Sequence, residues 1–214
     1  MVFGMEIIPT PKTALGRPKD PQKTTLILDA AGQLFLEKGF GATSMEAVAQ
    51  RAGVSKQTLY SHFGGKDDLF KHVVANKVDH YDLAAFGRTL TWDLQQDLHA
   101  LGKLFLSLLL DAEAVAMMRV VISEAHQNPR IAEMFYAMGP SRIIETLDTY
   151  FQEQQRRQAL HLEGVYQPSV LFLNLLKGEW HMQALMGLSP VVSESMLDQH
   201  VTACVQQFLS VLRG

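Results

Sequence analysis

Apolar residues recur at helical spacing along most of this 214-residue chain. The first such stripe is formed by Ile27, Ala30, Ala31, Leu34 and Phe35, which repeat at positions i, i+3, i+4, i+7 and i+8. An Asp-Pro pair at 20–21 is typical of a helix start, and a Lys-Gly pair at 38–39 is typical of a helix end. The pattern therefore predicts a first helix over about residues 21–38.

Two short helices joined by a tight turn are predicted next. The run Thr43-Ser44-Met45-Glu46 fits a capping box with Thr43 as the cap, and the helix that it starts reaches residue 52. Gly53 suits the left-handed conformation of a turn, and Ser55 suits the cap of a second short helix that reaches residue 63. A longer helix over residues 66–85 follows. Because three helices with a tight turn between the second and the third form a helix-turn-helix unit, we expect one at about residues 45–64.

The rest of the chain shows helical patterns and no β-alternation of useful length. The expected helices cover about residues 94–111, 112–127, 130–138, 140–158, 167–187 and 190–213. Residues 1–20 contain several prolines and no periodicity, which favours a flexible arm. We therefore expect an all-α protein in which this arm precedes a helix-turn-helix domain at 21–65 and a second helical domain at 66–214.

Charge divides the chain into a basic front part and an acidic remainder. The net charge is -3, but residues 12–77 hold 10 Lys and Arg against 6 Asp and Glu, whereas residues 78–214 hold 9 against 15. A basic first third is suited to a polyanionic partner. The longest nearly unbroken apolar run, residues 104–110, is much shorter than the ~20 residues that a membrane span needs, and no secretory start is evident. The single cysteine, Cys204, excludes an intramolecular disulfide, so we expect a soluble, cytoplasmic protein without membrane contact.

The outer surface of the expected helix-turn-helix unit carries side chains suited to a DNA duplex. The Gln57 amide can bond base edges, and the Thr58 methyl can meet a thymine methyl. The hydroxyl and basic side chains around them suit phosphates, as does the helix start at 43–44, and Arg17 in the arm suits the minor groove. The expected DNA contacts are Arg17, Thr43, Ser44, Ser55, Lys56, Gln57, Thr58, Tyr60, Ser61, His62 and Lys66.

Simpler roles remain open for some of these residues. Tyr60 and His62 can pack against neighbours or be solvated, and the arm around Arg17 can be a solubilising leader. A lone helical tyrosine or histidine usually has such a role. Here, however, packing or solvation would have to explain the whole set of candidate DNA contacts at once.

The residues of this unit also resemble those of a known family. The run from Ala49 to Phe63, AQRAGVSKQTLYSHF, followed by GKDDL at 65–69, resembles the DNA-binding domain of the TetR (tetracycline-repressor) family. The preceding helix resembles it too, so the resemblance covers about residues 22–75. It implies an all-helical homodimer whose first three helices bind DNA and whose remaining helices bind a small ligand and dimerise. Residues 118–125 and 135–140 resemble a C-terminal subclass typified by efflux and quorum-related regulators.

Aromatic and long apolar side chains of the second domain are candidates for lining an effector cavity. Those we expect are Trp92, Phe105, Leu109, Met117, Phe135, Tyr136, Tyr150 and Trp180, with Met138 and Met182 beside them. Such a cavity suits a hydrophobic or cationic aromatic effector. Glu113, Glu124 or His126 can orient a polar group on it, although no spacing singles these three out. The alternative for each apolar residue is ordinary core packing.

The last two expected helices, at about residues 167–213, carry apolar faces. In the TetR family such a pair builds a four-helix bundle with its two-fold mate, whereas an apolar stripe by itself also fits an intramolecular core. Because one short recognition helix contacts few base pairs, a homodimer on a palindromic operator raises affinity and specificity together.

The sequence contains no motif of a known catalytic or metal site. The Glu-x-x-His spacing of di-iron bundles is missing, as are His-Glu-x-x-His, Gly-x-Ser-x-Gly and the phosphate-binding glycine loops. We therefore expect no enzyme activity, no catalytic residue, no metal and no cofactor. The predicted function is transcriptional regulation by a repressor that leaves its operator when an effector displaces the helix at 66–85. The alternatives are a helical metalloenzyme and a helical adaptor that does not bind DNA.

Overall fold

The computed structural model describes residues 21–81, 83, 86, 90–157, 162, 164–188 and 190–212. Within these ranges the chain forms α-helices and no β-strand, which confirms the predicted all-α class. The helices are α1 (Pro21–Ala42), α2 (Met45–Ala52), α3 (Lys56–Phe63), α4 (Lys66–His80), α5 (Leu94–Leu109), α6 (Ala112–Ala125), α7 (Pro129–Met138), α8 (Pro140–Arg156), α9 (Pro168–Leu185) and α10 (Glu194–Val211). None of these helices combines the length and the apolar character that crossing a bilayer requires. The expected arm at 1–20, with Arg17, lies outside the described residues.

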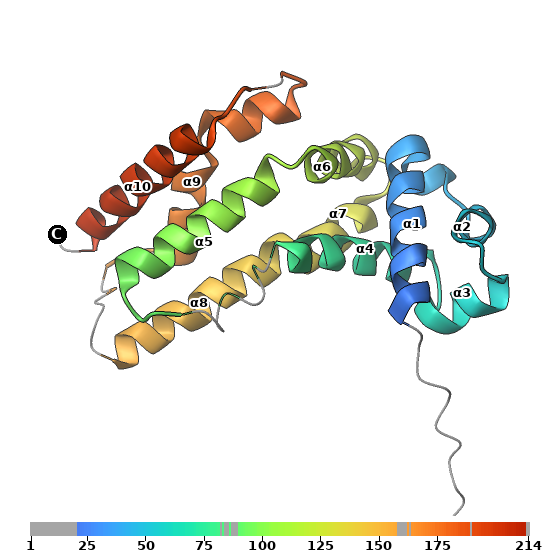
Figure 1. Cartoon of the computed structure of the whole chain (residues 1–214), viewed down its shortest axis with the longest axis horizontal. Helices are drawn as coiled ribbons and strands as arrows, with labels where there is room; N and C mark the ends of the chain where they lie inside the picture. The colour runs from blue at the N-terminus through green and yellow to red at the C-terminus, as the bar shows by residue number, and fades with distance from the viewer. Residues whose placement is uncertain are drawn as a thin grey trace, which may run out of the picture.

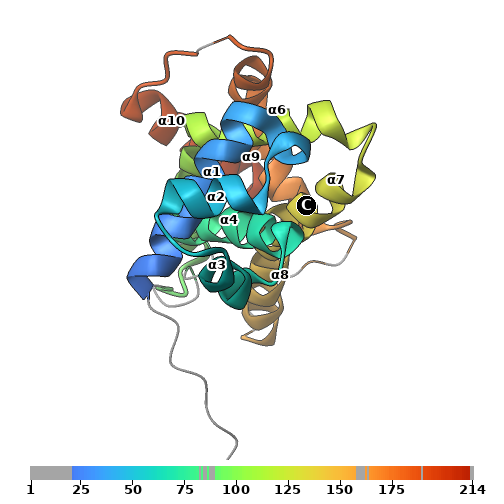
Figure 2. The same ribbon diagram turned by 90° about the vertical axis from the view of Figure 1, so that its right-hand side faces the viewer.

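The helices form an elongated molecule with α1, α2 and α3 at one end (Figure 1). α5, α8, α9 and α10 lie at the other end, and α4, α6 and α7 lie between the two groups. When the first end faces the viewer, α2, α3 and α4 lie next to α1, and α10 lies behind them (Figure 2). The expected helix-turn-helix unit and the last two helices are therefore at opposite ends of the molecule.

Two apolar cores hold this arrangement together. The first joins α1 to α4 with side chains of α6 and α7, among them Met117 and Ile131. The second joins α5, α8, α9 and α10. α4 contributes Phe70 and Val74 to the first core and Val78 to the second. One helix, α4, therefore takes part in both cores.

The junction between α1 and α2 differs from the expected one. α1 continues to Ala42, but Gly39 inside it has a φ of 80° and interrupts the helical geometry. The Thr43 hydroxyl is buried and donates to the carbonyl oxygens of Leu34 at 3.1 Å and Gly39 at 2.7 Å. The cap of α2 is Ser44, whose hydroxyl accepts the N–H of Ala47 at 3.2 Å. The predicted cap at Thr43 was wrong by one residue, because its hydroxyl satisfies the end of α1 instead.

The turn between α2 and α3 has the predicted chemistry. Gly53 has a φ of 67°, a left-handed conformation that side chains disfavour. The Ser55 hydroxyl accepts the N–H of Thr58 at 3.1 Å and so caps α3. Leu59 and Phe63 anchor the inner face of α3 in the first core. The helix-turn-helix unit is therefore present where it was expected, whereas α4 ends at His80 and not in the mid-80s.

Candidate nucleic-acid interface and effector cavity

One face of α3 is buried and the opposite face is open to solvent. The exposed side chains at its start and along its outer face are Ser55, Lys56, Gln57, Tyr60 and Ser61. The Tyr60 side chain keeps 45% of its surface in solvent, although an aromatic ring is costly to expose. The hydroxyl, amide and amine groups around this exposed ring are of the types that bind phosphates and base edges in protein–DNA complexes.

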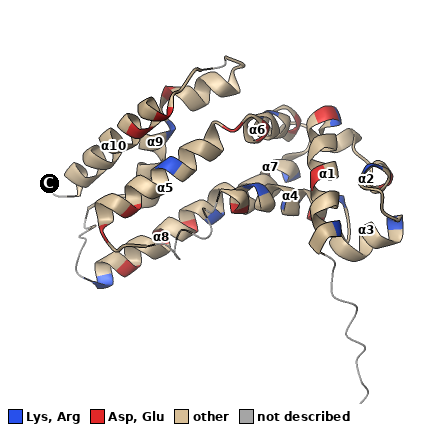
Figure 3. Ribbon diagram, in the orientation of Figure 1, with Lys and Arg blue, Asp and Glu red and all other residues tan. Residues whose placement is uncertain are grey.

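Lys56 is held by a neighbour on α2. Its ammonium lies 2.8 Å from Oε1 of Glu46, and the hydrogen bond from Lys56 lowers the pKa of the Glu46 carboxyl. Both side chains are more than half exposed, so the pair contributes little to stability and can open. A phosphate can therefore replace Glu46 as the partner of Lys56. Basic positions occur on both α2 and α3 (Figure 3).

The other expected DNA contacts divide between the surface and the interior. Ser44 is exposed at the start of α2, whereas Thr58 and His62 are half-buried on α3. The Lys66 ammonium donates to the carbonyl oxygens of Phe40 at 2.8 Å and Gly41 at 3.1 Å, so it braces the end of α1. Thr43 has only 2% of its surface exposed, which keeps its hydroxyl away from a duplex, and we remove it from the candidate surface.

A cavity of about 380 Å³ lies where the two apolar cores meet. Residues of α1, α4, α5, α6, α7, α8 and α9 line it. Its volume is within the ~300–1,000 Å³ that small-molecule pockets usually have. Of the expected lining residues, Phe105, Leu109, Met117 and Phe135 are in its wall, whereas Trp92, Tyr136, Tyr150 and Trp180 are not. Tyr136 is exposed on α7, and Trp180 packs against the imidazole of His200.

Charged side chains join α4 to α6 at one edge of this cavity. The Lys77 ammonium lies 2.7 Å from Oδ1 of Asp111 and 2.9 Å from Oε2 of Glu113, and the Tyr81 hydroxyl donates to Asp111 at 2.9 Å. Burial by itself would raise the pKa of Asp111, but hydrogen bonds from Lys77, the Ala114 N–H and Tyr81 hold it below its usual value. Burial by itself would lower the pKa of Lys77, and the two carboxylates raise it instead. Both partners therefore stay charged at neutral pH.

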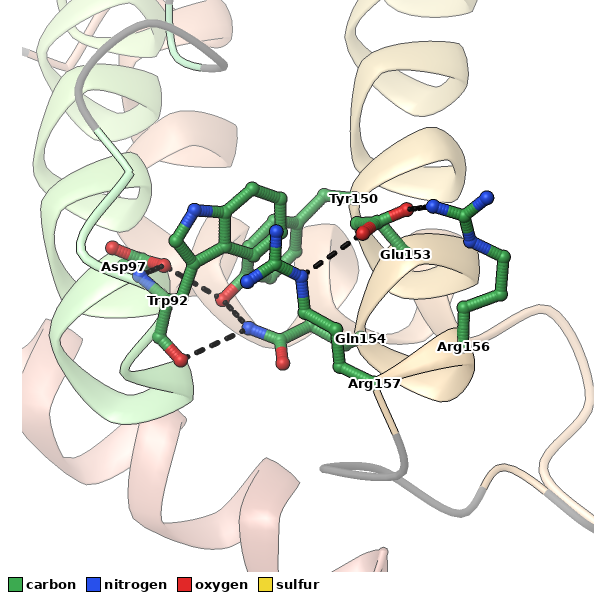
Figure 4. Close-up of polar contacts among 7 residues, drawn as sticks. All are labelled: Trp92, Asp97, Tyr150, Glu153, Gln154, Arg156 and Arg157. Carbon is green, nitrogen blue, oxygen red and sulfur yellow. Dashed lines mark hydrogen bonds and ion pairs between the residues drawn. The ribbon is translucent and has the colours of Figure 1, made fainter.

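Trp92 and Tyr150 belong to a separate polar cluster (Figure 4). The Tyr150 hydroxyl donates to Oδ2 of Asp97 at 3.0 Å, and the Gln154 amide donates to the Tyr150 oxygen at 2.8 Å. The Arg157 guanidinium lies 3.5 Å from the centre of the Trp92 ring. Asp97 is buried, and a buried carboxylate needs several hydrogen-bond donors, which this cluster supplies. Burial also raises the pKa of Tyr150, so its hydroxyl remains a donor.

α6 links the cavity to distant parts of the molecule. The Glu124 carboxylate accepts the N–H of Phe40 at 2.7 Å and the N–H of Gly41 at 2.9 Å, and so binds the end of α1. On the same helix Arg119 donates to the carbonyl oxygen of Leu185 at 3.0 Å and to that of Ala184, at the end of α9. The sequence suggested a ligand contact for Glu124, and it included Arg119 only in the stretch 118–125 that carries the family resemblance, without a role of its own. No local signal pairs Glu124 with a backbone N–H that lies 84 positions earlier in the chain.

Two family models match this chain. Residues 27–73 match the model described as bacterial regulatory proteins, tetR family. Residues 96–212 match the model described as AefR-like transcriptional repressor, C-terminal domain, and this match alone covers more than half of the chain.

Individual relatives and solved structures that resemble this chain are transcriptional regulators as well. The HTH-type transcriptional activator FasR of Mycolicibacterium smegmatis is 40% identical over 62 residues, which cover 29% of this chain and 28% of that relative. The chain thus spans little more than a quarter of the length of that curated relative. A TetR-family transcriptional regulator from Mesorhizobium loti has a similar structure, with a TM-score of 0.73, 28% identity and coverage of 89% of this chain and 96% of that one. The Flavonoid-responsive Regulator FrrA has a TM-score of 0.70 and 29% identity, and the match covers 90% of this chain and 97% of that one.

Proposed function

The chain belongs to the TetR family of bacterial regulatory proteins, and on this premise we propose that it is a transcriptional repressor which a small-molecule effector releases from DNA. The observation that carries the proposal is that α4 lines the cavity and also packs under the helix-turn-helix unit. The match of the larger part of the chain to a repressor domain favours repression over activation. We expect the protein in the bacterial cytoplasm, because its operator DNA lies there.

The proposed DNA contacts lie on α3 and at the starts of α2 and α4. They are Ser44, Ser55, Lys56, Gln57, Thr58, Tyr60, Ser61, His62 and Lys66. Exposure of Lys56, Gln57 and Tyr60 supports the proposal most directly, because these three long side chains are open to solvent on α3. A recognition helix of this length covers few base pairs, so we propose a palindromic operator that is read by two copies of α3.

The proposed homodimer interface includes the end of α9 and the start of α10. Five large apolar side chains are exposed to solvent in this segment. They are Met182, Met186, Leu188, Val191 and Met196. Several large apolar side chains exposed within one short segment favour a protein–protein interface there. In an isologous dimer each copy would cover the patch of the other, which brings two α3 helices to one duplex.

The proposed release mechanism uses α4 and α6 together. A ligand that prefers a shifted α4 shifts the whole helix-turn-helix unit, because Phe70 and Val74 are packed in the first core. α6 lines the same cavity and holds the end of α1 through Glu124. Two connections therefore run from the cavity to the DNA-binding end, and the coupling between effector and operator must be reciprocal.

The proposed effector is a hydrophobic small molecule. Most side chains in the cavity wall are apolar, and Phe105 and Phe135 offer aromatic surfaces. A similar fold in a regulator whose name states that it responds to flavonoids supports an aromatic compound. No catalytic residue is proposed, because the relatives and structural neighbours are transcriptional regulators.

Selection of DNA from the host genome tests the proposed function. Sheared genomic fragments are passed over the immobilised full-length protein, and the retained fragments are sequenced. We expect a shared inverted repeat among them, and we expect the variant Tyr60→Ala to retain far less of it. Retention of random fragments, or of none, would overturn the proposal.

A second variant tests the route through α6. Glu124→Gln keeps one hydrogen-bond acceptor for the end of α1 and directs an amide N–H at the second backbone N–H. We expect this variant to bind the selected operator and to be released less completely by an effector. Glu133→Gln, an exposed position on α7, is the matched control and should behave as the wild type.

A further inference from the structure

One histidine in the cavity wall has a defined hydrogen-bonding role. His181 lies on α9, just after Gly178, whose φ of 52° interrupts that helix. Its Nδ1 is 3.1 Å from the carbonyl oxygen of Leu109, the last residue of α5. The last carbonyls of a helix have no donor within the helix, and a carbonyl oxygen only accepts. Nδ1 therefore carries the proton that it donates to Leu109.

The second ring nitrogen is consequently an acceptor. Burial lowers the pKa of His181, the bond to the Leu109 carbonyl opposes this, and the nearby Lys177 ammonium lowers it further. The net shift is downward, so the imidazole is neutral at pH 7, with Nδ1 protonated and Nε2 bearing a lone pair. Among the described residues no group bonds Nε2, and His181 is part of the cavity wall, so Nε2 is the candidate hydrogen-bond acceptor that this residue has for a ligand.

The charges in the cavity wall argue against an ionic ligand. The described lining residues hold two ammonium groups, on Lys77 and Lys177, and two carboxylates, on Asp29 and Glu113, so their formal charges balance. Lys77 is already held by Glu113 and by Asp111, at 2.9 and 2.7 Å. An anionic ligand would meet the two carboxylates, and a cationic ligand would meet the two ammonium groups. A neutral compound is repelled by neither set of charges, and it loses no ionic hydration when it enters the cavity.

We propose that the effector is a neutral, largely apolar compound with a hydroxyl group that donates a hydrogen bond to Nε2 of His181. The inference rests on the proposed function and narrows the class of effector. A compound without a donor leaves a partly buried acceptor unpaired, which costs affinity. The cavity thereby distinguishes a phenol or alcohol from an ether or hydrocarbon of the same shape.

Three matched biphenyls test this inference on the full-length protein by calorimetry at pH 7.5. We expect 4-hydroxybiphenyl to bind about tenfold more tightly than 4-methoxybiphenyl and more tightly than biphenyl-4-carboxylate. In His181→Phe the preference for the hydroxyl compound should disappear. The matched control is His126→Phe, at an exposed position outside the cavity wall, and it should keep the preference.

A second measurement does not depend on any variant. Nitrogen-15 spectra of the wild-type imidazole should show the Nδ1–H tautomer, and the Nε2 signal should move when 4-hydroxybiphenyl is added. An Nε2–H tautomer, equal affinities for the hydroxyl and methoxy compounds, no binding of 4-hydroxybiphenyl, or tightest binding of the carboxylate would each overturn the inference. Retention of genomic DNA is measured on the same preparation without ligand, so these failures are distinguishable from a failure of the proposed function.

Discussion

Gly39 lies so close to Glu124 that the two residues fit together only because Gly39 has no side chain. A Cβ atom at Gly39 would collide with Oε1 of Glu124, and the φ of 80° at Gly39 is one that L side chains rarely adopt. The same carboxylate binds the N–H groups of Phe40 and Gly41. The end of α1 and the end of α6 therefore form one tightly packed joint between the helix-turn-helix unit and the cavity.

We expect Gly39→Ala to lower the free energy of unfolding by at least ~1–3 kcal/mol, which is the cost of a side chain at this positive φ with extended ψ before the collision is counted. Gly32→Ala is the matched control, because Gly32 is inside α1 and the nearest atom to a new Cβ would be Cγ1 of Val73 at 3.7 Å. The Gly32→Ala substitution should raise the free energy of unfolding by roughly 0.5–1 kcal/mol. Urea unfolding followed by circular dichroism measures both. Equal changes in the free energy of unfolding of the two variants would show that the contact between Gly39 and Glu124 does not require a glycine.

We expect Lys56→Ala to weaken operator binding and to reduce the slope of log affinity against log salt by about 2, because the dimer carries two copies of Lys56 and loses one phosphate contact in each half-site. Fluorescence anisotropy with a labelled duplex at several salt concentrations measures this slope. Lys38→Ala removes a charge from the exposed end of α1 and should leave the slope unchanged. An unchanged slope in Lys56→Ala would remove this side chain from the contact surface.

Much of the fold is predictable from the sequence because its signals are local. Apolar spacing indicates the helices, and Gly53 and Ser55 mark a turn and a cap through their own backbone preferences. The cap at 43–44 shows the limit of such signals. Thr43 and Ser44 both offer a hydroxyl, and only the packing of Thr43 against the end of α1 decides which of them caps α2.

The cavity is less predictable, because it depends on how distant helices pack. Phe105 and Tyr150 are both buried aromatic residues in the second domain, yet only Phe105 is in the cavity wall. Tyr150 bonds Asp97, a partner 53 positions away that no periodicity indicates. The role of Glu124 depends in the same way on contact with the end of α1, and its residue type alone also suits a ligand contact.

We expect Met186→Lys to convert a dimer into a monomer, because a charge would then be buried in the proposed interface. Met186 keeps 73% of its surface exposed in the single chain, so the substitution should hardly change the stability of the monomer. Sedimentation velocity measures the association state. Ile122→Lys, at a 58% exposed position on α6, is the control and should remain dimeric. A dimeric Met186→Lys would exclude this patch from the interface.

The preference for 4-hydroxybiphenyl over 4-methoxybiphenyl should depend on pH in a defined direction. The pKa of His181 lies below its usual value of about 6.5, so the acceptor at Nε2 is present throughout pH 7–8. As the pH falls through the lowered pKa, protonation removes the acceptor and the preference disappears. The folded state also binds this proton less readily than the unfolded chain, so acid lowers stability in the same range. Nitrogen-15 spectra locate the pKa of His181, calorimetry above and below that pH measures the preference, and a ratio that stays constant across it would contradict the assigned tautomer.

The most direct test of the proposed regulator is the dependence of binding on half-site spacing in the selected operator. Two α3 helices held by one dimer require half-sites about one helical turn, ~34 Å, or a multiple of it apart on the same face of the duplex. Insertion of about five base pairs between the half-sites rotates them to opposite faces, and we expect the affinity to fall by roughly 100-fold. Equal affinity for the original and the lengthened duplex would contradict a paired reading of DNA by α3.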